Sequence, residues 1–484
     1  MARSIYWYDL ETFGTHPRLD RIAQFAGLRT DEALNELGEP LVLYCKITQD
    51  YVPDPKACLI TGITPEETLR KGLSERRFIE RINEEFMQPG SCVAGFNSIA
   101  FDDEFIRATL YRNLMDPFRR EWAGGNSRWD LLDVLRAARD LRPQGITWPE
   151  GENGRPTFRL EKLTEANALP HQNAHDALSD VRATIAMARL LREKQPKIFS
   201  YLYRGRIKDH ARQLIDLHKR RPFLHTSAML SNEYGYTSIL APVAPHPANQ
   251  NAILCFDLRQ DPEPLIERSV DELRRLIFAP SEELSLEESR IRLIPIHINR
   301  SPVLAPLSTL DPDTAKRLGL DVTLCGKRAA KLAEASLLTQ KIMEVFRRDE
   351  AEIRRDPELE IYSGGFFSDA DRQRMERFRE LSPEAMLKRR GDFYDRRLPE
   401  LAWRFVCRNH SEILDENERK KWKSFCAGRL LFPPERLIND FAFFKRKVKE
   451  LSGDTNLPAG DKKIIKKLAE WATIIEVDVL SYEG

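Results

Sequence analysis

The sequence predicts an α/β domain, then a small β-rich domain, then an all-helical domain. Three observations predict this order: strand and helix patterns alternate over residues 1–196, prolines crowd the middle of the chain, and helical periodicity dominates from residue 354 onward. The chain has 484 residues, whereas single hydrophobic cores stop growing at about 250–300 residues. We therefore expect domains over residues 1–196, 197–349 and 350–484.

The first domain alternates strand and helix candidates. Apolar runs predict the strands, which are Ile5–Leu10, Ile22–Arg29, Pro40–Ile47 and Cys92–Phe96. The polar segment Thr30–Glu39 suits a hairpin-like connection between the second and third strands. Helical spacing predicts the helices, which are Ser74–Met87, Asp102–Asn113, Asp130–Leu141, Arg159–Ala168 and Asp176–Lys194. This alternation predicts a sheet covered by helices.

Proline marks the second domain, and helical periodicity marks the third. Ten of the 29 prolines lie between Pro242 and Pro312, a density that breaks long helices and keeps strands short. The predicted elements there are strands Ala252–Leu258 and Ile291–Ile298, with helices Asp313–Leu318 and Lys327–Arg348 leading out. The helices predicted beyond them are Asp369–Leu381, Pro383–Lys388, Pro399–Asn409, Asn417–Arg429, Pro434–Leu451 and Asp461–Ile475.

Composition excludes several classes of protein. Hydrophobic residues at 42% and charged residues at 31% exclude wholesale disorder. The net charge of +1 decides nothing about nucleic acid, because only a groove has to be positive. Seven scattered cysteines without a CxxC pair support neither a zinc site nor disulfides. We expect a cytoplasmic protein without a membrane span, because no signal peptide and no long apolar stretch are visible.

Asp9 and Glu11 end the first predicted strand. Residues i and i+2 of a strand point to the same face, so both carboxylates converge at one edge of the sheet. Carboxylates this close repel one another unless a cation neutralises them, and oxygen ligands suit Mg²⁺ or Mn²⁺. An exposed acidic pair at a strand end is the alternative. The following Thr12-Phe13-Gly14 suits a loop where a nucleotide lies close to the backbone.

Two later segments add acids and a histidine. Asp102 follows a short strand and a turn and begins a helix, although on its own it is typical of a helix cap. His175 lies on the loop that enters a long helix, and Asp180 lies in the first turns of that helix. Capping by Asp176 explains part of this segment. The three acidic pieces together, in this order, rarely coincide by chance.

The order Asp–Glu, Asp, His–x4–Asp resembles the DEDDh exonucleases, which have a ribonuclease-H-like, DnaQ-like fold. The likeness is closest to the bacterial exonuclease I family, and it is carried by Asp9–Pro17, Leu59–Pro65, Asn126–Asp133, Asn173–Ala177 and Tyr362–Arg372. This resemblance implies a DnaQ-like nuclease domain, an SH3-like β domain and a helical domain that together clamp single-stranded DNA.

The resemblance also implies the chemistry: a 3′→5′ exonuclease that degrades single-stranded DNA to 5′-mononucleotides, in DNA repair, recombination and mismatch correction. Two Mg²⁺ ions about 3.5–4 Å apart would hold the scissile phosphate, with Mn²⁺ as a substitute. We assign Asp9, Glu11 and Asp180 as metal ligands, with Asp102 completing the site. His175 would accept the proton of the attacking water.

Arginines and aromatic residues interleave between residues 107 and 148, as in single-strand binding surfaces where cations follow phosphates and rings stack on bases. The members are Arg107, Arg112, Arg119, Arg120, Arg128, Arg136, Arg139, Arg142, Tyr111, Phe118, Trp122, Trp129 and Trp148. The alternative is that several arginines pair with nearby acids and that Trp129 and Trp148 are core. The expected substrate-binding residues are Glu11, Arg107, Phe118, Trp122, Arg136, Arg142 and Arg159. The resemblance implies the choice of Arg107, Phe118, Trp122, Arg136 and Arg159, and it implies that Arg159 lies near the terminal nucleotides.

A second basic cluster lies at the predicted junction of the first two domains. Its members are Arg204, Arg206, Lys208, Arg212, Lys219, Arg220 and Arg221. Such a cluster suits an acidic peptide, and the resemblance implies one, the acidic C-terminal tail of single-stranded-DNA-binding protein. Binding should weaken steeply with salt. The basic residues of the helical domain, such as Lys388–Arg390, are expected to be mainly solvated surface.

Two other functions remain open. A ribonuclease of the same superfamily would carry the same five residues, although such relatives are mostly single-domain chains. A catalytically inactive single-strand-binding module would have lost at least one of the five, and none is lost. We expect the chain to act as a monomer.

Overall fold

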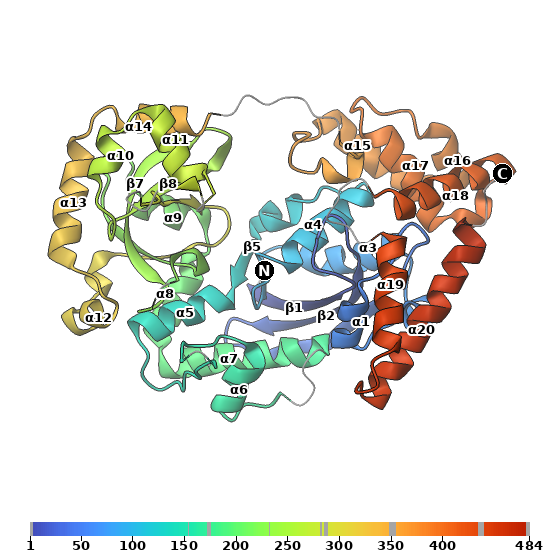
Figure 1. Ribbon diagram of the computed structural model, residues 1–484, viewed down its shortest axis with the longest axis horizontal. Helices are drawn as coiled ribbons and strands as arrows, with labels where there is room; N and C mark the ends of the chain where they lie inside the picture. The colour runs from blue at the N-terminus through green and yellow to red at the C-terminus, as the bar shows by residue number, and fades with distance from the viewer. Residues whose placement is uncertain are drawn as a thin grey trace. The chain divides into compact units, whose positions relative to one another are not determined.

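The computed structural model describes residues 3–152, 154–171, 176–231, 233–280, 283–284, 289–347, 355–433 and 440–480. The chain forms two compact units (Figure 1). Unit 1 consists of Met1–Asn126, His171–Arg182 and Ile353–Gly484, and unit 2 consists of Ser127–Pro170 and Ala183–Glu352. The two ends of the chain therefore belong to the same unit.

Unit 1 is built on a mixed sheet with the strand order β3-β2-β1-β4. The strands are β1 Ser4–Thr12, β2 Ile22–Asp31, β3 Glu36–Tyr44 and β4 Ser91–Gly95. β1 pairs antiparallel with β2 and parallel with β4, and β3 pairs antiparallel with β2. β1 is thus an inner strand, and its far end carries the predicted acidic pair.

Unit 1 carries two groups of helices. The first group comprises α1 Pro55–Thr61, α2 Pro65–Lys71, α3 Glu75–Phe86 and α4 Asp102–Arg112. The second group comprises α15 Asp369–Arg379, α16 Pro383–Arg389, α17 Leu398–Asn409, α18 Glu416–Leu431, α19 Phe441–Ser452 and α20 Ala459–Ile475. The helices α19 and α20 contact α1, so the C-terminal helices lie against the N-terminal part of the unit (Figure 1).

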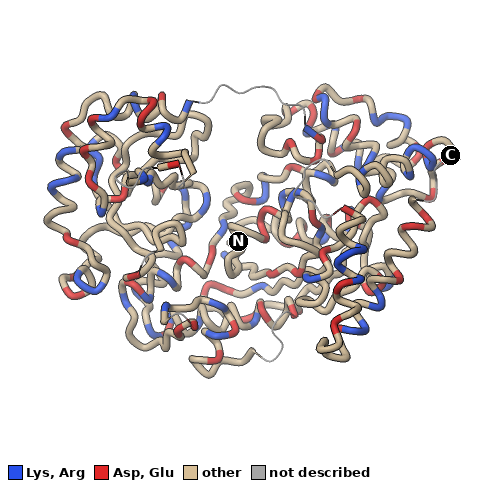
Figure 2. The backbone as a smooth tube through the Cα atoms, in the orientation of Figure 1, with Lys and Arg blue, Asp and Glu red and all other residues tan. Residues whose placement is uncertain are grey.

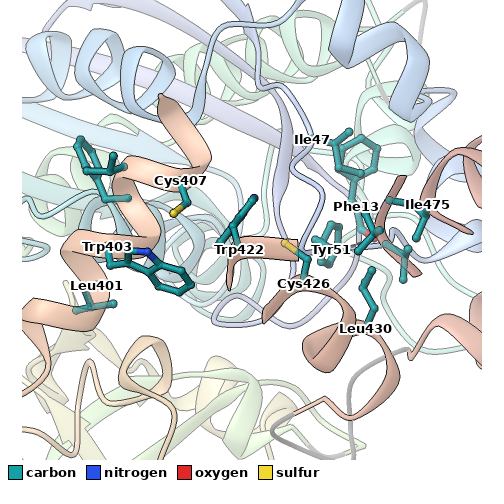
Figure 3. Packing of buried hydrophobic residues seen from close by; sticks show 14 of the residues in the cluster. Phe13, Ile47, Tyr51, Leu401, Trp403, Cys407, Trp422, Cys426, Leu430 and Ile475 are labelled. Atoms are coloured by element: carbon teal, nitrogen blue, oxygen red, sulfur yellow. Dashed lines mark hydrogen bonds between the residues drawn. The ribbon is translucent and has the colours of Figure 1, made fainter. Parts of the chain in front are cut away.

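One hydrophobic core joins the segment after β1 to these C-terminal helices. Figure 3 shows Phe13 and Tyr51 in the same cluster as Trp422, Leu430 and Ile475. Phe13 is completely buried, and full burial of a side chain of this size contributes about 1.5–3 kcal/mol. The C-terminal helices therefore stabilise the loop that directly follows the acidic pair.

Unit 2 contains a second sheet with the order β10-β6-β7-β8-β9, in which every neighbouring pair is antiparallel. The strands are β6 Phe223–Thr226, β7 Thr237–His246, β8 Asn249–Asp257, β9 Leu293–His297 and β10 Val303–Ala305. The pairing of β7 with β8 shifts register next to Pro242 and Pro245, because proline has no N–H to donate to the ladder.

Unit 2 also contains one short strand and several helices. They are β5 Ser127–Asp130, α5 Leu131–Leu141, α6 Leu160–Ala166, α8 Pro196–Gly205, α9 Lys208–Leu214, α10 Glu263–Glu267, α11 Val270–Phe278, α12 Pro312–Arg317, α13 Val322–Glu334 and α14 Leu338–Val345. Helix α7, Ala177–Lys194, begins in unit 1 and continues into unit 2. Among the described helices, none combines the length and the apolar character that crossing a membrane requires.

The predicted sequence of fold classes, α/β then β-rich then helical, is confirmed, with corrections to single elements. The single helix predicted over Lys327–Arg348 is wrong, because the chain breaks between α13 and α14. At the break, the guanidinium of Arg220 donates hydrogen bonds to the carbonyl groups of Leu332 and Ala335, the latter at 3.0 Å. Carbonyl groups released by the break are therefore satisfied by a side chain from elsewhere in the unit.

Three further predictions were incomplete. The strand predicted over Pro40–Ile47 starts earlier, at Glu36, because the hairpin turn needs only residues 32–35. Helices α1 and α2 were not predicted, although each begins with a capping residue followed by proline, at Asp54 and Thr64. Residues 434–439 of the predicted helix Pro434–Leu451 lie outside the described residues, and α19 begins at Phe441.

Candidate active site

The alternation of β1 places its acidic side chains on one face of the sheet. Tyr6, Tyr8 and Leu10 belong to a core with residues of α3 and α4, so Asp9 and Glu11 point to the opposite face. The parallel partner β4 pairs with β1 only as far as the residue pair of Trp7 with Ala94. Both carboxylates therefore lie beyond the end of β4, while their backbones still pair with β2.

Asp180 completes a cluster of three carboxylates. It lies in the first turns of α7. One oxygen atom from each of Asp9, Glu11 and Asp180 lies within 4.8 Å of the other two. Two distant segments of the sequence thus supply these three carboxylates, and we call them the acidic triad.

The acidic triad is electrostatically strained. Burial, and then the charges of Asp9, Asp180 and Asp176, raise the pKa of Glu11 to about 9. Burial and the charge of Asp180 likewise raise the pKa of Asp9 well above its ordinary value, although a hydrogen bond from the backbone N–H of Leu10 opposes the shift. The charges acting on Glu11 are all negative, so ionisation of the triad requires a cation. The purely oxygen donor set fits a hard divalent ion such as Mg²⁺ or Mn²⁺.

Asp102 and Asp103 have different surroundings. Asp102 is the first residue of α4 and is buried. Asp103 accepts hydrogen bonds from the hydroxyl group of Tyr8 at 2.7 Å and from the guanidinium of Arg120 at 2.6 Å, all within the interior. Asp103 therefore anchors α4 to β1. The prediction that Asp102 completes the metal site stays a prediction, since Asp102 is not among the three clustered carboxylates.

Two histidines, His171 and His175, precede α7 in the sequence. His175, the predicted base, lies outside the described residues. His171 was not predicted from the sequence, and its Nε2 lies 2.6 Å from Oδ1 of Asp180. A hydrogen bond of this length orients the Asp180 carboxylate. The only signal available in the sequence was a second histidine four residues before His175.

The loop after Glu11 is held by a small polar network. The Asp20 carboxylate accepts the backbone N–H of His16 at 2.8 Å and the hydroxyl group of Tyr51 at 2.9 Å. Tyr51 also donates to the carbonyl group of Phe13 at 3.0 Å. A Cβ atom at Gly14 would lie 2.1 Å from a carboxylate oxygen of Asp20, so this position requires glycine. These contacts hold the backbone of the loop in place, which is compatible with the predicted close approach of a nucleotide to it.

In unit 1 the predicted DNA contacts have two kinds of environment. Arg107 is buried and binds Glu121 through two hydrogen bonds of 2.6 and 2.9 Å, and Glu104 through one of 2.6 Å. Its guanidinium carbon lies 5.4 Å from the ring centroid of Phe118. Trp122, in contrast, is 68% exposed. Trp122 is therefore available for stacking, whereas Arg107 holds Phe118 and two acids in place.

In unit 2 the three predicted contacts also differ. Arg136 forms an ion pair with Asp133 at 2.6 Å. Arg142 donates to the carbonyl group of Thr309 at 2.9 Å. Arg159 precedes α6 and is exposed. Arg159 is the most accessible of the three, and all three remain predicted substrate contacts.

Several other members of the arginine–aromatic segment are interior residues. Arg112 is buried against Glu75 at 2.8 Å. Trp129 is 1% exposed and packs edge-on against Phe199 and Tyr203. The core alternative therefore holds for Trp129. Arg120, which binds Asp103, and Arg128, which donates to the carbonyl group of Asn299, are also buried.

The second basic cluster is only partly a surface. Arg220 is buried at the break between α13 and α14, so its inclusion was wrong. Arg206 stacks over the ring of Tyr203 at 3.7 Å. Arg204 lines a cavity of about 790 Å³ together with Tyr201 and Arg142, among others. That cavity, rather than the whole cluster, is the feature that could hold an acidic peptide.

Comparisons with known proteins agree with this arrangement. Three protein-family models match the chain. The family described as "Exonuclease" matches residues 6–188, the exonuclease I SH3-like domain matches residues 206–348, and the exonuclease I C-terminal domain matches residues 355–475. Exodeoxyribonuclease I of Haemophilus influenzae is 45% identical over 431 residues, which cover 88% of this chain and 90% of that protein.

Solved structures extend the similarity to the whole chain. Exonuclease I from Methylocaldum szegediense has a TM-score of 0.92 and 44% identity, and covers 98% of this chain and 100% of its own. Escherichia coli exonuclease I in complex with a dA16 oligonucleotide has a TM-score of 0.91 and 41% identity, with the same coverage.

Proposed function

The chain belongs to the exonuclease I family of exodeoxyribonucleases, and we propose that it removes 5′-mononucleotides from the 3′ end of single-stranded DNA at the acidic triad. The observation that carries this proposal is the convergence of Asp9, Glu11 and Asp180 to within 4.8 Å at the end of β1. The similarity to a relative solved with a DNA oligonucleotide supports the substrate. We further propose a role in DNA repair, recombination and mismatch correction, in the cytoplasm, where the buried free thiols of the chain would stay reduced.

Asp9, Glu11 and Asp180 would hold two Mg²⁺ ions, with Asp102 completing the donor set. When bound, the ions supply positive charge that stabilises the attacking and leaving oxygens of the phosphodiester. Support comes from the raised pKa values of Asp9 and Glu11, since each proton that these groups retain can be replaced by a cation. An Escherichia coli exonuclease I–DNA complex has been solved with zinc, so Zn²⁺ is a competitor to include when the metal preference is measured.

The remaining groups of the chain orient the reactants. His175 would accept the proton of the attacking water, as the DEDDh motif implies. His171 would orient the Asp180 carboxylate through its 2.6 Å contact. The fixed loop around Phe13 would hold the terminal nucleotide near the backbone, and Trp122 and Arg159 would bind the strand as it approaches.

The test is a substrate panel. The protein is incubated with 3′- or 5′-labelled single-stranded DNA, with duplex DNA and with RNA, in Mg²⁺ and in chelator. We expect the 3′ label to be released first as a mononucleotide from single-stranded DNA, in Mg²⁺ alone. Cleavage that survives the chelator would overturn the mechanism, and a preference for RNA or duplex would overturn the substrate in favour of the ribonuclease alternative.

We also propose that the cavity lined by Arg142, Tyr201 and Arg204 binds the acidic C-terminal tail of single-stranded-DNA-binding protein. A solved structure of SSB/exonuclease I in complex with the inhibitor CFAM, 39% identical to this chain, supports the partner. The lining offers cations together with apolar groups such as Ile198 and Leu202, and a short acidic tail needs cationic and apolar contacts together.

Binding of a labelled acidic tail peptide tests this second proposal. Changing Arg204 to Gln should weaken binding about tenfold and should reduce its salt dependence. Arg221 provides the matched control. It is exposed, lies 4.0 Å from Asp216 and does not line the cavity. Equal losses in both variants would point to nonspecific charge attraction instead.

A further inference from the structure

The helical part of unit 1 contains a cavity of about 580 Å³ that includes no member of the acidic triad and no predicted DNA contact. Its lining comes from α15, from the end of α16 and from the segment that follows α16. Charges of both signs are spread along the chain (Figure 2), but the lining contains Arg374, Arg377 and Arg389 against the single acid Asp392. Among the described residues around it, the cavity therefore carries an excess of positive charge.

The same cavity has an aromatic wall. Phe378 and Phe393 form its apolar floor, with ring centroids 5.5 Å apart. Tyr394 stands at the rim with 74% of its surface exposed. The guanidinium carbon of Arg374 lies 3.8 Å from the centroid of the Tyr394 ring. A stacked arginine on one face leaves an exposed aromatic side chain on which a further planar group can stack.

Asp371 fixes the position of this rim. It is 2% exposed and lies in the first turn of α15. Its carboxylate accepts the backbone N–H of Tyr394 at 2.9 Å and the backbone N–H of Asp395 at 3.1 Å. Arg374 and Arg377 follow on the same helix at a spacing of three residues, so they share one face. The aromatic ring and the arginines are therefore held in one arrangement before any ligand arrives.

We propose that this cavity binds one nucleotide of a single DNA strand, as a site separate from the acidic triad. The phosphate would pair with Arg377 and with Arg389, whose guanidinium also pairs with Asp392 at 2.8 Å, and the base would stack at Tyr394. The volume lies within the range of small-ligand sites, about 300–1,000 Å³. An acidic peptide would satisfy the arginines but would leave the exposed ring without a planar partner, so the aromatic wall favours a nucleotide. This inference rests on the proposed function, because it takes the substrate strand as the ligand.

Binding of oligothymidylates of increasing length, followed by fluorescence anisotropy in chelator, tests the inference. In Arg377→Gln and Tyr394→Leu we expect long strands to bind about tenfold more weakly, since one stacked base is worth about 1–3 kcal/mol. Short strands, which occupy the triad alone, should bind as in the wild type. Loss of one phosphate contact should lower the salt slope by about 0.7. Tyr394→Phe keeps the ring and should retain long-strand binding.

Arg419→Gln is the matched control, because Arg419 is exposed in the same helical part and does not line the cavity. Unchanged long-strand affinity in the test variants would overturn the inference, as would equal losses for short and long strands. Loss of acidic-peptide binding or of free thymidylate binding, with long strands unaffected, would also overturn it. Hydrolysis of a short labelled strand in Mg²⁺ is measured in parallel, so failure of the proposed function shows in the wild type and is distinguishable from failure at the cavity.

Discussion

Unit 1 buries carboxylates in two contrasting ways. The acidic triad groups Asp9, Glu11 and Asp180 with one another. A second group, which we call the ionic cluster, surrounds its acids with arginines, and its members are Asp50, Glu75, Glu358, Arg21, Arg112, Arg404, Arg408 and Arg429. Asp50 and Glu358 are completely buried there, and Arg408 lies 2.7 Å from Asp50.

The pKa values of the carboxylates in the two groups are shifted in opposite directions. Burial raises the pKa of Glu358, but Arg408, Arg429 and Arg404 outweigh it and hold that pKa well below its ordinary value. At Glu11 burial and the neighbouring acids act in the same direction, and the pKa rises to about 9. In the ionic cluster the chain supplies its own cations, so the acids are structural. In the triad the described charges that act on Glu11 are all acidic, so a cation from solution would stabilise its ionised form, and this difference supports the triad as the proposed functional site.

The largest expected effect comes from removing one charge of the triad. Glu11→Gln should lower the rate of DNA hydrolysis by at least about 10³-fold, because one group that stabilises the transition state is lost. In chelator the thermal unfolding temperature should stay the same or rise, since repulsion with Asp9 and Asp180 is relieved. Single-turnover hydrolysis and circular dichroism melting measure the two effects.

Asp176→Asn is the control for this prediction. Asp176 adds negative charge near Glu11 and caps the start of α7 by accepting the backbone N–H of Ser179, and asparagine caps equally well. The control should keep most of the activity. If Glu11→Gln hydrolysed DNA at the wild-type rate, the triad would not be the catalytic site.

Removing one charge of the ionic cluster should lower the stability of the protein and leave its activity unchanged. Glu358→Gln leaves Arg408 and Arg429 buried with too little negative charge, so the free energy of unfolding should fall by about 3–5 kcal/mol. The hydrolysis rate per folded molecule should be unchanged. Denaturant unfolding measures the loss, with Glu416→Gln as control, because Glu416 forms an exposed ion pair with Lys420. A selective loss of activity in Glu358→Gln would erase the contrast between the two groups.

The sequence could predict the triad but not the ionic cluster, for a physical reason. Alternation along β1 is local, so the common face of Asp9 and Glu11 follows from their spacing alone. The pairing of Arg408 with Asp50 joins residues 358 positions apart, and no local pattern encodes it. The core that joins Phe13 to the C-terminal helices is equally long-range, which is why domain limits placed by composition do not reveal it.

The arginine–aromatic segment shows a second limit of local pattern. Arg107 and Trp122 look alike in the sequence as members of a DNA-binding run, yet one is buried against Glu121 and the other is 68% exposed. Exposure depends on what packs above each residue, and spacing does not contain that information. His171 was missed for the same reason, because no local sequence pattern shows that its ring contacts Asp180.

A smaller effect is expected at His171, whose Nε2 lies 2.6 Å from the carboxylate of Asp180. His171→Ala removes the group that orients Asp180, so the concentration of Mg²⁺ needed for half-maximal hydrolysis should rise about 10–100-fold. Metal titration of the hydrolysis rate measures this. His218→Ala, an exposed histidine of unit 2, is the control. Tighter metal binding in His171→Ala would mean that the histidine competes with the ion for Asp180.

The smallest effect is the dependence of stability on pH, and it distinguishes the two groups of carboxylates without changing the catalytic step. Because the folded-state pKa of Glu11 is raised from 4.5 to about 9, folding retains a proton that the unfolded chain has already released. The stability that this proton provides is complete below pH 4.5 and is lost as the pH rises toward 9. The ionic cluster, whose pKa values are lowered, loses stability only as the pH falls into the acid range. In chelator, the melting temperature should therefore fall by a few degrees between pH 4.5 and about pH 9. The conversion is about 2–4 °C for each kcal/mol of lost stability. Added Mg²⁺ or the Glu11→Gln variant should flatten this slope, and an unchanged slope in that variant would assign the pH dependence to other groups.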